Sequence, residues 1–327
     1  MTVSSSCSPN LRSVRQCILC GSGESSLWLR AACPERPGEL FDIVECEACG
    51  LRYVTPRPEG EALAAYYAQD YYSYTFQGVQ PRSHKLKVRL WRALGLLPPK
   101  DRGPGWRWRA ALLAVGALRG IRAVWTVPAQ RAGARFLDIG GGAGERLELA
   151  RDMGWQTFGL DMGEAAVAAA AARGHRMVAG DAQALPFADQ SMDFVNMSHV
   201  LEHTLDPVQA LRELRRVLKP GGVTQITVPN TNSWSARRYG DAWRALEVPR
   251  HLYHFTEHTA RRMLEHAGLL VVSLRTLPNL WVWEESRKAA GERTPSAREV
   301  REWEYAARRG EGENLDVWCV RGRFVKI

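Results

Sequence analysis

The stretch FLDIGGGAG, from Phe136 to Gly144, decides the fold of this 327-residue chain. An apolar run with one acid inside it ends in a cluster of glycines, a pattern typical of a buried strand that turns sharply into a helix. The amphipathic segment ERLELARDMG follows, and then a second apolar run, TFGLD, that ends at Asp161. Strand and helix patterns alternate from there toward the C-terminus, which predicts an α/β protein with a doubly wound parallel sheet.

The glycines after the first strand predict a ligand-binding loop. In doubly wound sheets, ligands bind at the carboxyl ends of the strands, and Gly140, Gly142 and Gly144 stand at such an end. Glycine lets the backbone turn sharply and approach a ligand closely. Asp161 closes the next strand, where a carboxylate can accept hydrogen bonds from both hydroxyls of a ribose. The dinucleotide-binding fingerprint is G-x-G-x-x-G, and counted from Gly140 its third glycine falls at Glu145. The observed G-x-G-x-G spacing therefore does not match that fingerprint.

Together with Asp138, this loop resembles the first motif of class I S-adenosylmethionine-dependent methyltransferases. Two later segments, GDAQALPFADQSMDFVNMSHVLEH and RELRRVLKPGG, resemble further segments of that family in the correct order. The resemblance implies a Rossmann-like seven-stranded sheet and S-adenosylmethionine as the cofactor. A domain whose glycines only pack a helix on a strand is the alternative, but it leaves the acids at the strand ends unexplained. The cofactor-binding residues that the resemblance implies are Asp138, Gly140, Gly142, Gly144, Asp161, Met162, Asp181, Ala182 and Ser198.

Two C-x2-C pairs near the N-terminus indicate a metal site. The pairs Cys17/Cys20 and Cys46/Cys49 are separated by twenty-five residues. Each pair can present two thiolates, and two pairs complete a closed tetrahedral site for Zn²⁺. A closed site leaves no open coordination position, so the predicted role is structural. Core cysteines or a redox pair are the alternatives, but two matched pairs would then be a coincidence.

The segment that starts at Cys46 and ends in a tyrosine cluster resembles the zinc-binding region of a subset of these methyltransferases. That subset includes C-methyltransferases of nucleotide-linked sugars and other tailoring or cell-envelope enzymes. The resemblance implies that Tyr71 and Tyr72 contact the substrate or cofactor, although a helix face packed on the core explains them equally well. The sequence thus predicts a zinc ribbon in front of the methyltransferase domain.

The segment VPRHLYHF, residues 248–255, carries the candidate catalytic residue. In the sugar C-methyltransferases a Glu-His pair stands at this place and acts as the base, whereas this chain has Arg250 and His251. The resemblance implies that His251 is a base or a substrate-orienting group, and a capping or core histidine is the alternative. Arginine is suited to binding a carboxylate or phosphate, so Arg250 is a candidate substrate-binding residue. Glu202 and His203, in the earlier SHVLEH segment, are more typical of a scaffold role.

The positive charge of the chain is concentrated in one segment. The net charge is +9, and residues 81–135 hold thirteen Lys or Arg against one acid. Nucleic acid, an anionic membrane surface or an acidic substrate could bind such a segment, and so could the surface of the catalytic domain itself. No recognised RNA-binding motif accompanies it. We expect a small-molecule substrate, anionic or carrier-linked; an RNA or protein methyltransferase and a non-catalytic scaffold remain alternatives.

Changes in composition and the glycine- and proline-rich breaks along the chain predict the domain organisation. We expect a zinc-binding module over residues 11–75, a basic helical linker over 76–130, and a methyltransferase domain over 131–327 with an insertion at 278–313. The N-terminus lacks the layout of a secretory signal, and arginines interrupt the one long apolar segment, so a cytoplasmic protein without membrane spans is expected. The acceptor atom and the oligomeric state are left open.

Overall fold

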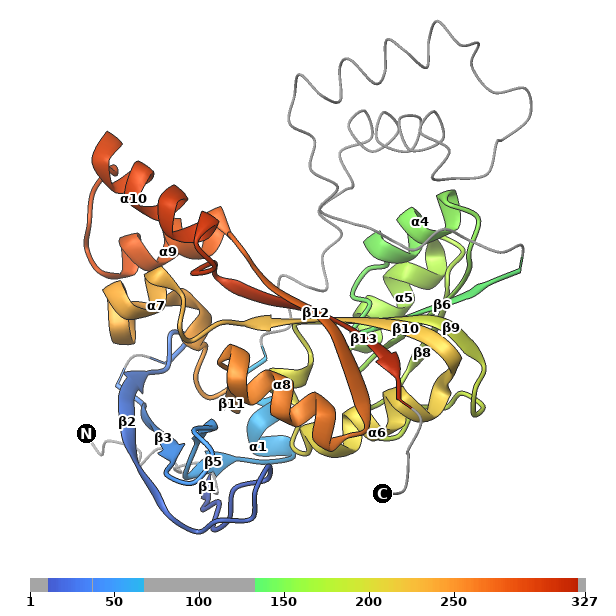
Figure 1. Cartoon of the computed structure of the whole chain (residues 1–327), viewed down its shortest axis with the longest axis horizontal. Helices are drawn as coiled ribbons and strands as arrows, with labels where there is room; N and C mark the ends of the chain where they lie inside the picture. The colour runs from blue at the N-terminus through green and yellow to red at the C-terminus, as the bar shows by residue number, and fades with distance from the viewer. Residues whose placement is uncertain (1–10, 37, 68–132, 323–327) are drawn as a thin grey trace, which may run out of the picture. The chain divides into compact units, whose positions relative to one another are not determined.

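The computed structural model describes residues 11–36, 38–67 and 133–322 (Figure 1). The chain divides into two compact units. The larger unit takes in the described residues of Met1–Tyr71, Ala182–Gln190 and Met197–Ile327, and the smaller unit those of Tyr72–Asp181 and Ser191–Asn196. None of the helices in the described ranges is both long and apolar enough to cross a bilayer.

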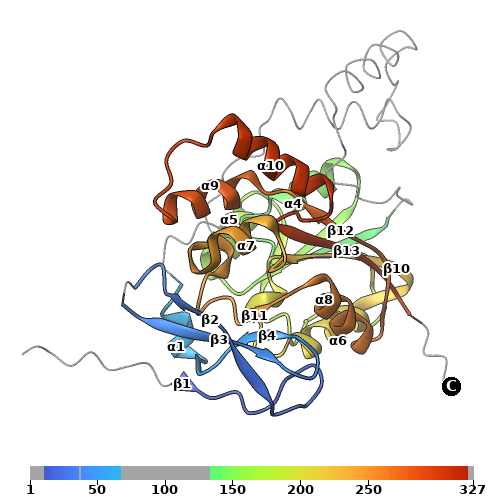
Figure 2. The same ribbon diagram turned by 60° about the vertical axis from the view of Figure 1, so that its left-hand side comes forward.

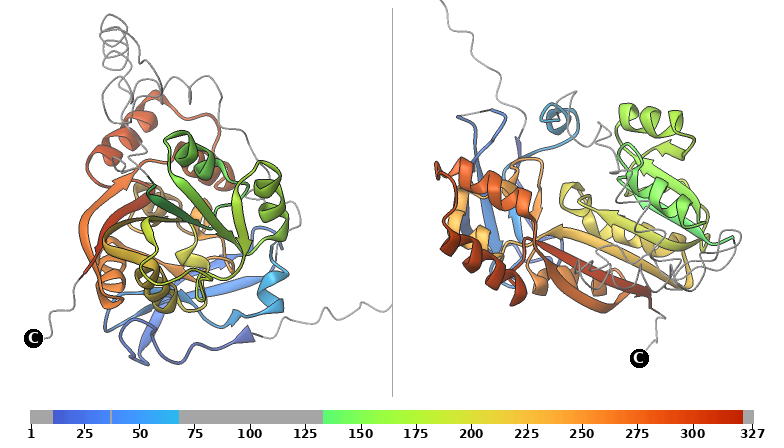
Figure 3. Two further views of the ribbon diagram at one scale, coloured as in Figure 1. Left: turned by 90° about the vertical axis from the view of Figure 1, so that its right-hand side faces the viewer. Right: turned by 90° about the horizontal axis from the view of Figure 1, so that it is seen from above.

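The smaller unit is built from strands and helices that alternate as predicted. Strands β6 (Arg135–Ile139), β7 (Gln156–Asp161) and β8 (Arg176–Ala179) pair in parallel. Helices α4 (Glu145–Asp152) and α5 (Glu164–Ala172) connect them and pack against them, as the green segments of Figure 3 show. Strand β6 is buried along four of its five residues, which is why its sequence reads as an almost continuous apolar run.

The main sheet has seven strands in the order β12-β13-β10-β9-β6-β7-β8. Its other four strands are β9 (Met192–Ser198), β10 (Leu218–Pro229), β12 (Leu269–Leu277) and β13 (Asn314–Arg321). The seven-stranded Rossmann-like sheet is therefore confirmed. The sheet is mixed, because β13 runs antiparallel to both of its neighbours. Strand direction has no local sequence signal, since the same side-chain alternation serves both orientations.

Two helices of the larger unit begin at side-chain caps. The Asp206 carboxylate accepts the backbone N–H of Gln209 at 2.8 Å and starts α6 (Pro207–Val217). A reciprocal capping box between Thr256 and Thr259 starts α8 (Glu257–His266). The Pro-Gly-Gly triplet that follows α6 lies inside β10.

The N-terminal segment forms a small antiparallel sheet that also recruits a distant strand. Strands β2 (Ser25–Ala32), β3 (Leu40–Cys46) and β4 (Arg52–Val54) follow one another, and β11 (Tyr253–His254) adds to the free edge of β4. The blue strands of Figure 1 show this sheet. The segment that carries the candidate catalytic histidine is thus hydrogen-bonded to the cysteine-bearing module.

A shorter ribbon and helix complete the module. Strands β1 (Leu11–Arg12) and β5 (Arg57–Pro58) form a two-stranded sheet. Helix α1 (Glu61–Ala64) follows. The basic helical linker predicted for residues 76–130 lies outside the described residues.

The insertion between β12 and β13 is helical. Helices α9 (Leu280–Ala289) and α10 (Ala297–Arg308) lie beside α7 (Trp234–Tyr239), as Figure 2 shows. The short turns η3 (Gly240–Ala242) and η4 (Arg244–Leu246) follow α7. Helix α7 and the two turns were not predicted, because six- and three-residue elements are too short to show a hydrophobic period.

These helices and the module share one apolar core within the larger unit. Trp243, buried and central, packs in the same cluster as Val54 of β4 and Trp283 of α9. The rings of Trp283 and Trp303 stack with their centroids 4.9 Å apart. Insertion, module and the β10–α7 connection therefore bury apolar surface against one another, which is the main source of their stability.

A buried carboxylate fixes this arrangement. Glu313, fully buried, accepts hydrogen bonds from Ser235 Oγ at 2.6 Å and from the indole N–H groups of Trp303 at 3.3 Å and Trp243 at 3.4 Å. Burial raises the pKa of Glu313, and these three donors oppose that shift. The insertion is thereby tied to α7 and its following turn at a single acid.

We predict that Glu313→Ala lowers the free energy of unfolding by about 2–4 kcal/mol, because it leaves two indoles and a hydroxyl without their acceptor. Glu313→Gln retains one acceptor oxygen and should cost less. Glu304→Ala, an exposed acid of α10, is the matched control and should change little. Chemical denaturation measures all three, and equal effects for Glu313→Ala and Glu304→Ala would contradict the role of this acid.

Candidate functional site

The glycine loop after β6 adopts a backbone that side chains disfavour. Gly140, Gly142 and Gly144 have φ angles of 71°, 50° and 92°. The N–H of Gly140 donates to the Leu160 carbonyl at 2.8 Å, so the loop folds back over the end of β7. At Gly144 a Cβ atom would stand 2.9 Å from Cδ2 of His175. Glycine is therefore required here by both conformation and space.

Asp161 ties this loop to the end of β7. One carboxylate oxygen accepts the N–H of Gly142 at 2.9 Å, and the other accepts the N–H of Gly163 at 2.9 Å. Each oxygen of a carboxylate has a second lone-pair direction, so both can still accept a hydroxyl. The acid and the loop thus form one rigid feature, and its donor and acceptor chemistry fits a ribose.

Asp138 lies beneath the loop in a buried polar network. Its Oδ1 accepts a hydrogen bond from Asn196 Nδ2 at 2.6 Å, and Arg146 hydrogen-bonds to the amide oxygen of Asn196. Burial raises the pKa of Asp138 to about 6, although Arg146 and the amide oppose the shift. Asn196 was not predicted as a site residue; its signal was an amide between the apolar residues Val195 and Met197 of β9.

The remaining predicted cofactor residues lie at strand ends or in loops. Met162, directly after β7, has 76% of its surface exposed, which is unusual for a large apolar side chain and fits the predicted contact with an adenine face. Asp181 and Ser198 are half-buried, and Ala182 is buried. Their contacts with a cofactor stay predictions.

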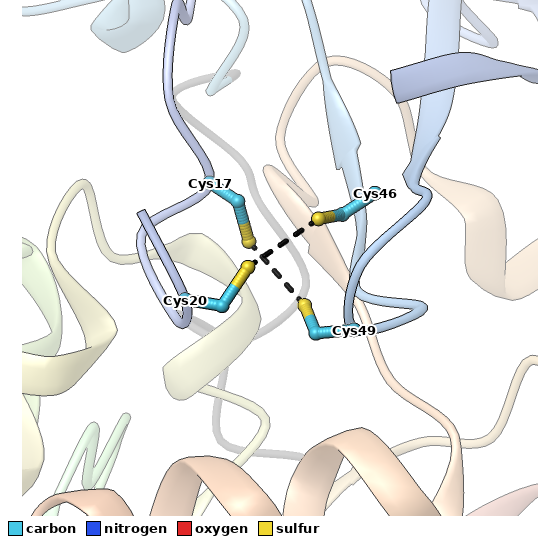
Figure 4. Close-up of side chains that lie close together, drawn as sticks. All are labelled: Cys17, Cys20, Cys46 and Cys49. Carbon is cyan, nitrogen blue, oxygen red and sulfur yellow. Dashed lines mark hydrogen bonds between the residues drawn. The ribbon is translucent and has the colours of Figure 1, made fainter. Parts of the chain in front are cut away.

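The four cysteines converge on one point, as Figure 4 shows. Their Sγ atoms all lie within 4.8 Å of one another. Cys17 and Cys49 Sγ are 3.5 Å apart, as are Cys20 and Cys46 Sγ. Tetrahedral zinc with bonds of about 2.3 Å places its sulfurs about 3.8 Å apart. The cluster therefore fits a four-thiolate zinc site, and none of the four is paired in a disulfide.

Both cysteine pairs are set in the same backbone turn. The N–H of Gly21 donates to the Cys17 carbonyl at 2.8 Å, and the N–H of Gly50 donates to the Cys46 carbonyl at 2.8 Å. These glycines have φ angles of 77° and 74°. Each C-x2-C-G segment is thus a tight knuckle that points two thiolates the same way, which explains why a glycine follows each pair.

The segment before β11 places His251 against η2 (Leu201–His203) in the larger unit. His251 is 5% exposed and lies with its ring centroid 4.6 Å from that of His203. Its Nδ1 is 2.8 Å from the Ala245 carbonyl oxygen. Burial lowers the pKa of His251 to about 3, so the ring is neutral at pH 7. Its catalytic assignment stays a prediction.

Arg250 is buried and paired with two carboxylates. Its Nη2 lies 2.7 Å from Glu35 Oε1 of the module and 3.1 Å from Glu247 Oε2. The guanidinium is thus neutralised by the protein itself, which favours a structural contribution; its assignment to the substrate stays a prediction. Tyr71, Tyr72 and the basic linker lie outside the described residues.

The model of a methyltransferase domain family matches residues 106–274, more than half of the chain. The chain belongs to this family. The match runs through the glycine loop, Asp161 and the segment of His251, so the resemblance that the sequence motifs implied is confirmed.

Curated relatives of this methyltransferase match it over part of their length. A Mycolicibacterium smegmatis protein named "probable S-adenosylmethionine-dependent methyltransferase" is 35% identical over 43% of this chain and 53% of its own. The malonyl-[acyl-carrier protein] O-methyltransferase of Serratia marcescens is 32% identical over 49% of this chain and 64% of its own. The demethylmenaquinone methyltransferase of Renibacterium salmoninarum is 38% identical over 36% and 45%. The chain spans about half the length of these relatives.

The zinc interpretation predicts that Cys46→Ser abolishes stoichiometric zinc binding and strongly destabilises the methyltransferase's N-terminal module, because one thiolate ligand is lost. Elemental analysis of the purified protein and thermal unfolding measure the two effects. Cys33→Ala, at a buried cysteine of the same module outside the cluster, should keep its zinc. Unchanged zinc content in Cys46→Ser would contradict the site.

A second prediction concerns pH. The pKa of Asp138 is raised from 3.8 to about 6 in the folded methyltransferase, so the folded state keeps a proton that the unfolded state releases between these values. Stability should therefore fall as the pH rises from about 4 to 6, by roughly 3 kcal/mol from this residue. Asp138→Asn should remove that dependence. Denaturation of both proteins across this range measures it, and parallel pH profiles would contradict it.

Proposed function

We propose that this chain is a methyltransferase that transfers the methyl group of S-adenosylmethionine to a small, anionic biosynthetic intermediate. The observation that carries the proposal is the carboxylate of Asp161, held by the N–H groups of Gly142 and Gly163 at the tip of β7. Membership of the methyltransferase domain family supports the reaction type. The reduced four-cysteine cluster agrees with the cytoplasmic location that the sequence predicts.

The segments after β6 and β7 offer most of the residues that would hold the cofactor. Asp161 would accept the ribose hydroxyls, Met162 would cover one adenine face, and the glycine loop would leave room for the methionine part. Asp181, Ala182 and Ser198 complete the proposed set. When bound, S-adenosylmethionine supplies a methyl group made electrophilic by its sulfonium. Catalysis of such a displacement depends mainly on holding the nucleophile in line with that group.

His251 is proposed as an orienting group on the acceptor side. A proton on Nδ1, shared with the Ala245 carbonyl, leaves the lone pair on Nε2. The pKa of about 3 makes this nitrogen a weak base at neutral pH. Of the two roles that the sequence suggested, we therefore propose orientation of the acceptor rather than removal of its proton.

The acceptor is proposed to be an acid, free or attached to a carrier. The net charge of +9, which residues 81–135 account for, favours anionic partners of any class. The Serratia marcescens relative is named for a malonyl group on an acyl-carrier protein, which is an acidic, carrier-linked acceptor. The RNA and protein alternatives depend on the basic linker, which up to residue 132 lies outside the described residues.

We predict that Asp161→Ala weakens S-adenosylmethionine binding about 100-fold, because it removes two hydrogen bonds to a charged group worth about 1.5 kcal/mol or more each. Isothermal titration calorimetry measures the dissociation constant. Asp241→Ala, at an exposed acid of η3, should bind like the wild type. A wild-type protein that binds no S-adenosylmethionine would leave only the non-catalytic scaffold.

The acceptor class is tested with methyl-labelled S-adenosylmethionine. We expect label in carboxylate acceptors, free or linked to an acyl-carrier protein, and none in total RNA or bulk protein. Label transferred to RNA, with retention on RNA that weakens as salt is raised, would overturn the acceptor class while leaving methyl transfer intact.

A further inference from the structure

Three ligand-type side chains meet in the larger unit, apart from the cysteine cluster. Glu202, His203 and His251 each offer an atom able to hold a metal ion, and these atoms all lie within 4.8 Å of one another. Glu202 and His203 stand on η2, directly after β9, and His251 stands just before β11. Residues nearly fifty positions apart in the sequence thus form one cluster of two imidazoles and a carboxylate.

Backbone carbonyls set the same tautomer on both histidines. His203 Nδ1 lies 3.1 Å from the Arg250 carbonyl oxygen and also 3.1 Å from the Tyr67 hydroxyl oxygen, and His251 Nδ1 lies 2.8 Å from the Ala245 carbonyl oxygen. A carbonyl oxygen only accepts, so each Nδ1 carries the proton and each Nε2 keeps a lone pair. Metal-binding histidines are oriented in this way by a hydrogen bond from their other nitrogen.

The carboxylate of Glu202 is buried with an unsatisfied oxygen. The residue is fully buried, and its Oε1 lies 3.1 Å from His199 Nδ1. Its Oε2 has no hydrogen-bond partner among the described residues. An unsatisfied carboxylate oxygen removed from water costs several kcal/mol unless a positive group compensates it. A bound cation would supply that compensation.

Two residues with a strained backbone, His199 and Glu247, border the cluster, and Glu247 is also a second acid there. His199 and Glu247 have φ angles of 55° and 41°, in a region that residues other than glycine rarely adopt. Such strain concentrates at functional sites, where the surrounding structure holds it. Glu247 Oε2 lies 3.8 Å from His251 Nε2, too far for a hydrogen bond. Arg250 and Arg244 already pair with the Glu247 carboxylate, so this acid leaves the Nε2 lone pair of His251 unengaged.

We propose that Glu202, His203 and His251 form a second metal site, which takes a divalent transition-metal ion such as Zn²⁺. Two imidazoles and one carboxylate are a donor set that zinc uses in sites with an open coordination position. The mixed nitrogen and oxygen donors favour Zn²⁺ over Mg²⁺, which prefers oxygen alone. The open position would accept an oxygen of the acceptor; that last step rests on the proposed function, whereas metal binding does not.

The test is metal stoichiometry on the full-length protein. The protein is treated with a weak chelator that leaves the four-thiolate site loaded, then titrated with Zn²⁺ by calorimetry, and bound zinc is counted by elemental analysis. We expect the wild type to bind a second equivalent of Zn²⁺, and excess Mg²⁺ not to displace it. A wild type that binds only one equivalent would overturn the proposal, whatever its methyltransferase activity.

Variants assign the second equivalent to these residues. Glu202→Gln keeps the size of the side chain and an acceptor for His199, and should weaken the second Zn²⁺ at least 10-fold; His251→Gln should do the same. Both should retain the first equivalent, which shows that the module is folded. His258→Ala, at an exposed histidine of α8, is the matched control and should bind like the wild type. A second equivalent that survives unchanged in both cluster variants would overturn the assignment.

Discussion

Tyr253 and His254 pair with Tyr53 and Arg52 in a two-residue antiparallel ladder, and the arrangement of the larger unit depends on it. The ladder adds a strand from the methyltransferase domain to the sheet that the cysteine module begins. His251 stands two residues before this strand, so its position is set partly by a segment two hundred residues earlier. The buried pair of Arg250 with Glu35 repeats the same connection through side chains. Module and domain are therefore one folding unit in this part of the chain.

Two polar networks of the smaller unit are formed by residues of that unit alone. The loop amide of Gly142 bonds to Asp161, and the amide of Asn196 bonds to Asp138, all within the α/β strands that the loop closes. Such short-range networks fix the glycine loop and the two acids through neighbours in the same unit.

Elements with a strong local pattern could be predicted from the sequence, and features set by distant contacts could not. The strand, glycine and helix order around Gly140 follows from apolar runs and turn residues, and the two cysteine knuckles follow from spacing. The antiparallel direction of β13 has no such signal. The neutralisation of Arg250 by Glu35 has no such signal either, because the two residues are far apart in the sequence. The charge of Arg250 alone therefore suggested an external anionic ligand. The tautomers of His203 and His251 depend on carbonyl positions that only the folded chain defines.

The buried acid at the end of the insertion restricts how α9 and α10 can behave. A segment that opens and closes over a substrate usually makes few buried polar contacts with its neighbours, so that opening costs little free energy. Glu313 instead joins the far end of the insertion to Ser235 of α7 and to Trp243 after η3, and also to Trp303 within the insertion. Moving the insertion away would leave the Glu313 carboxylate without its hydrogen bonds from Ser235 and Trp243. The helices between β12 and β13 therefore act as a fixed wall, and any gating must come from elsewhere in the chain.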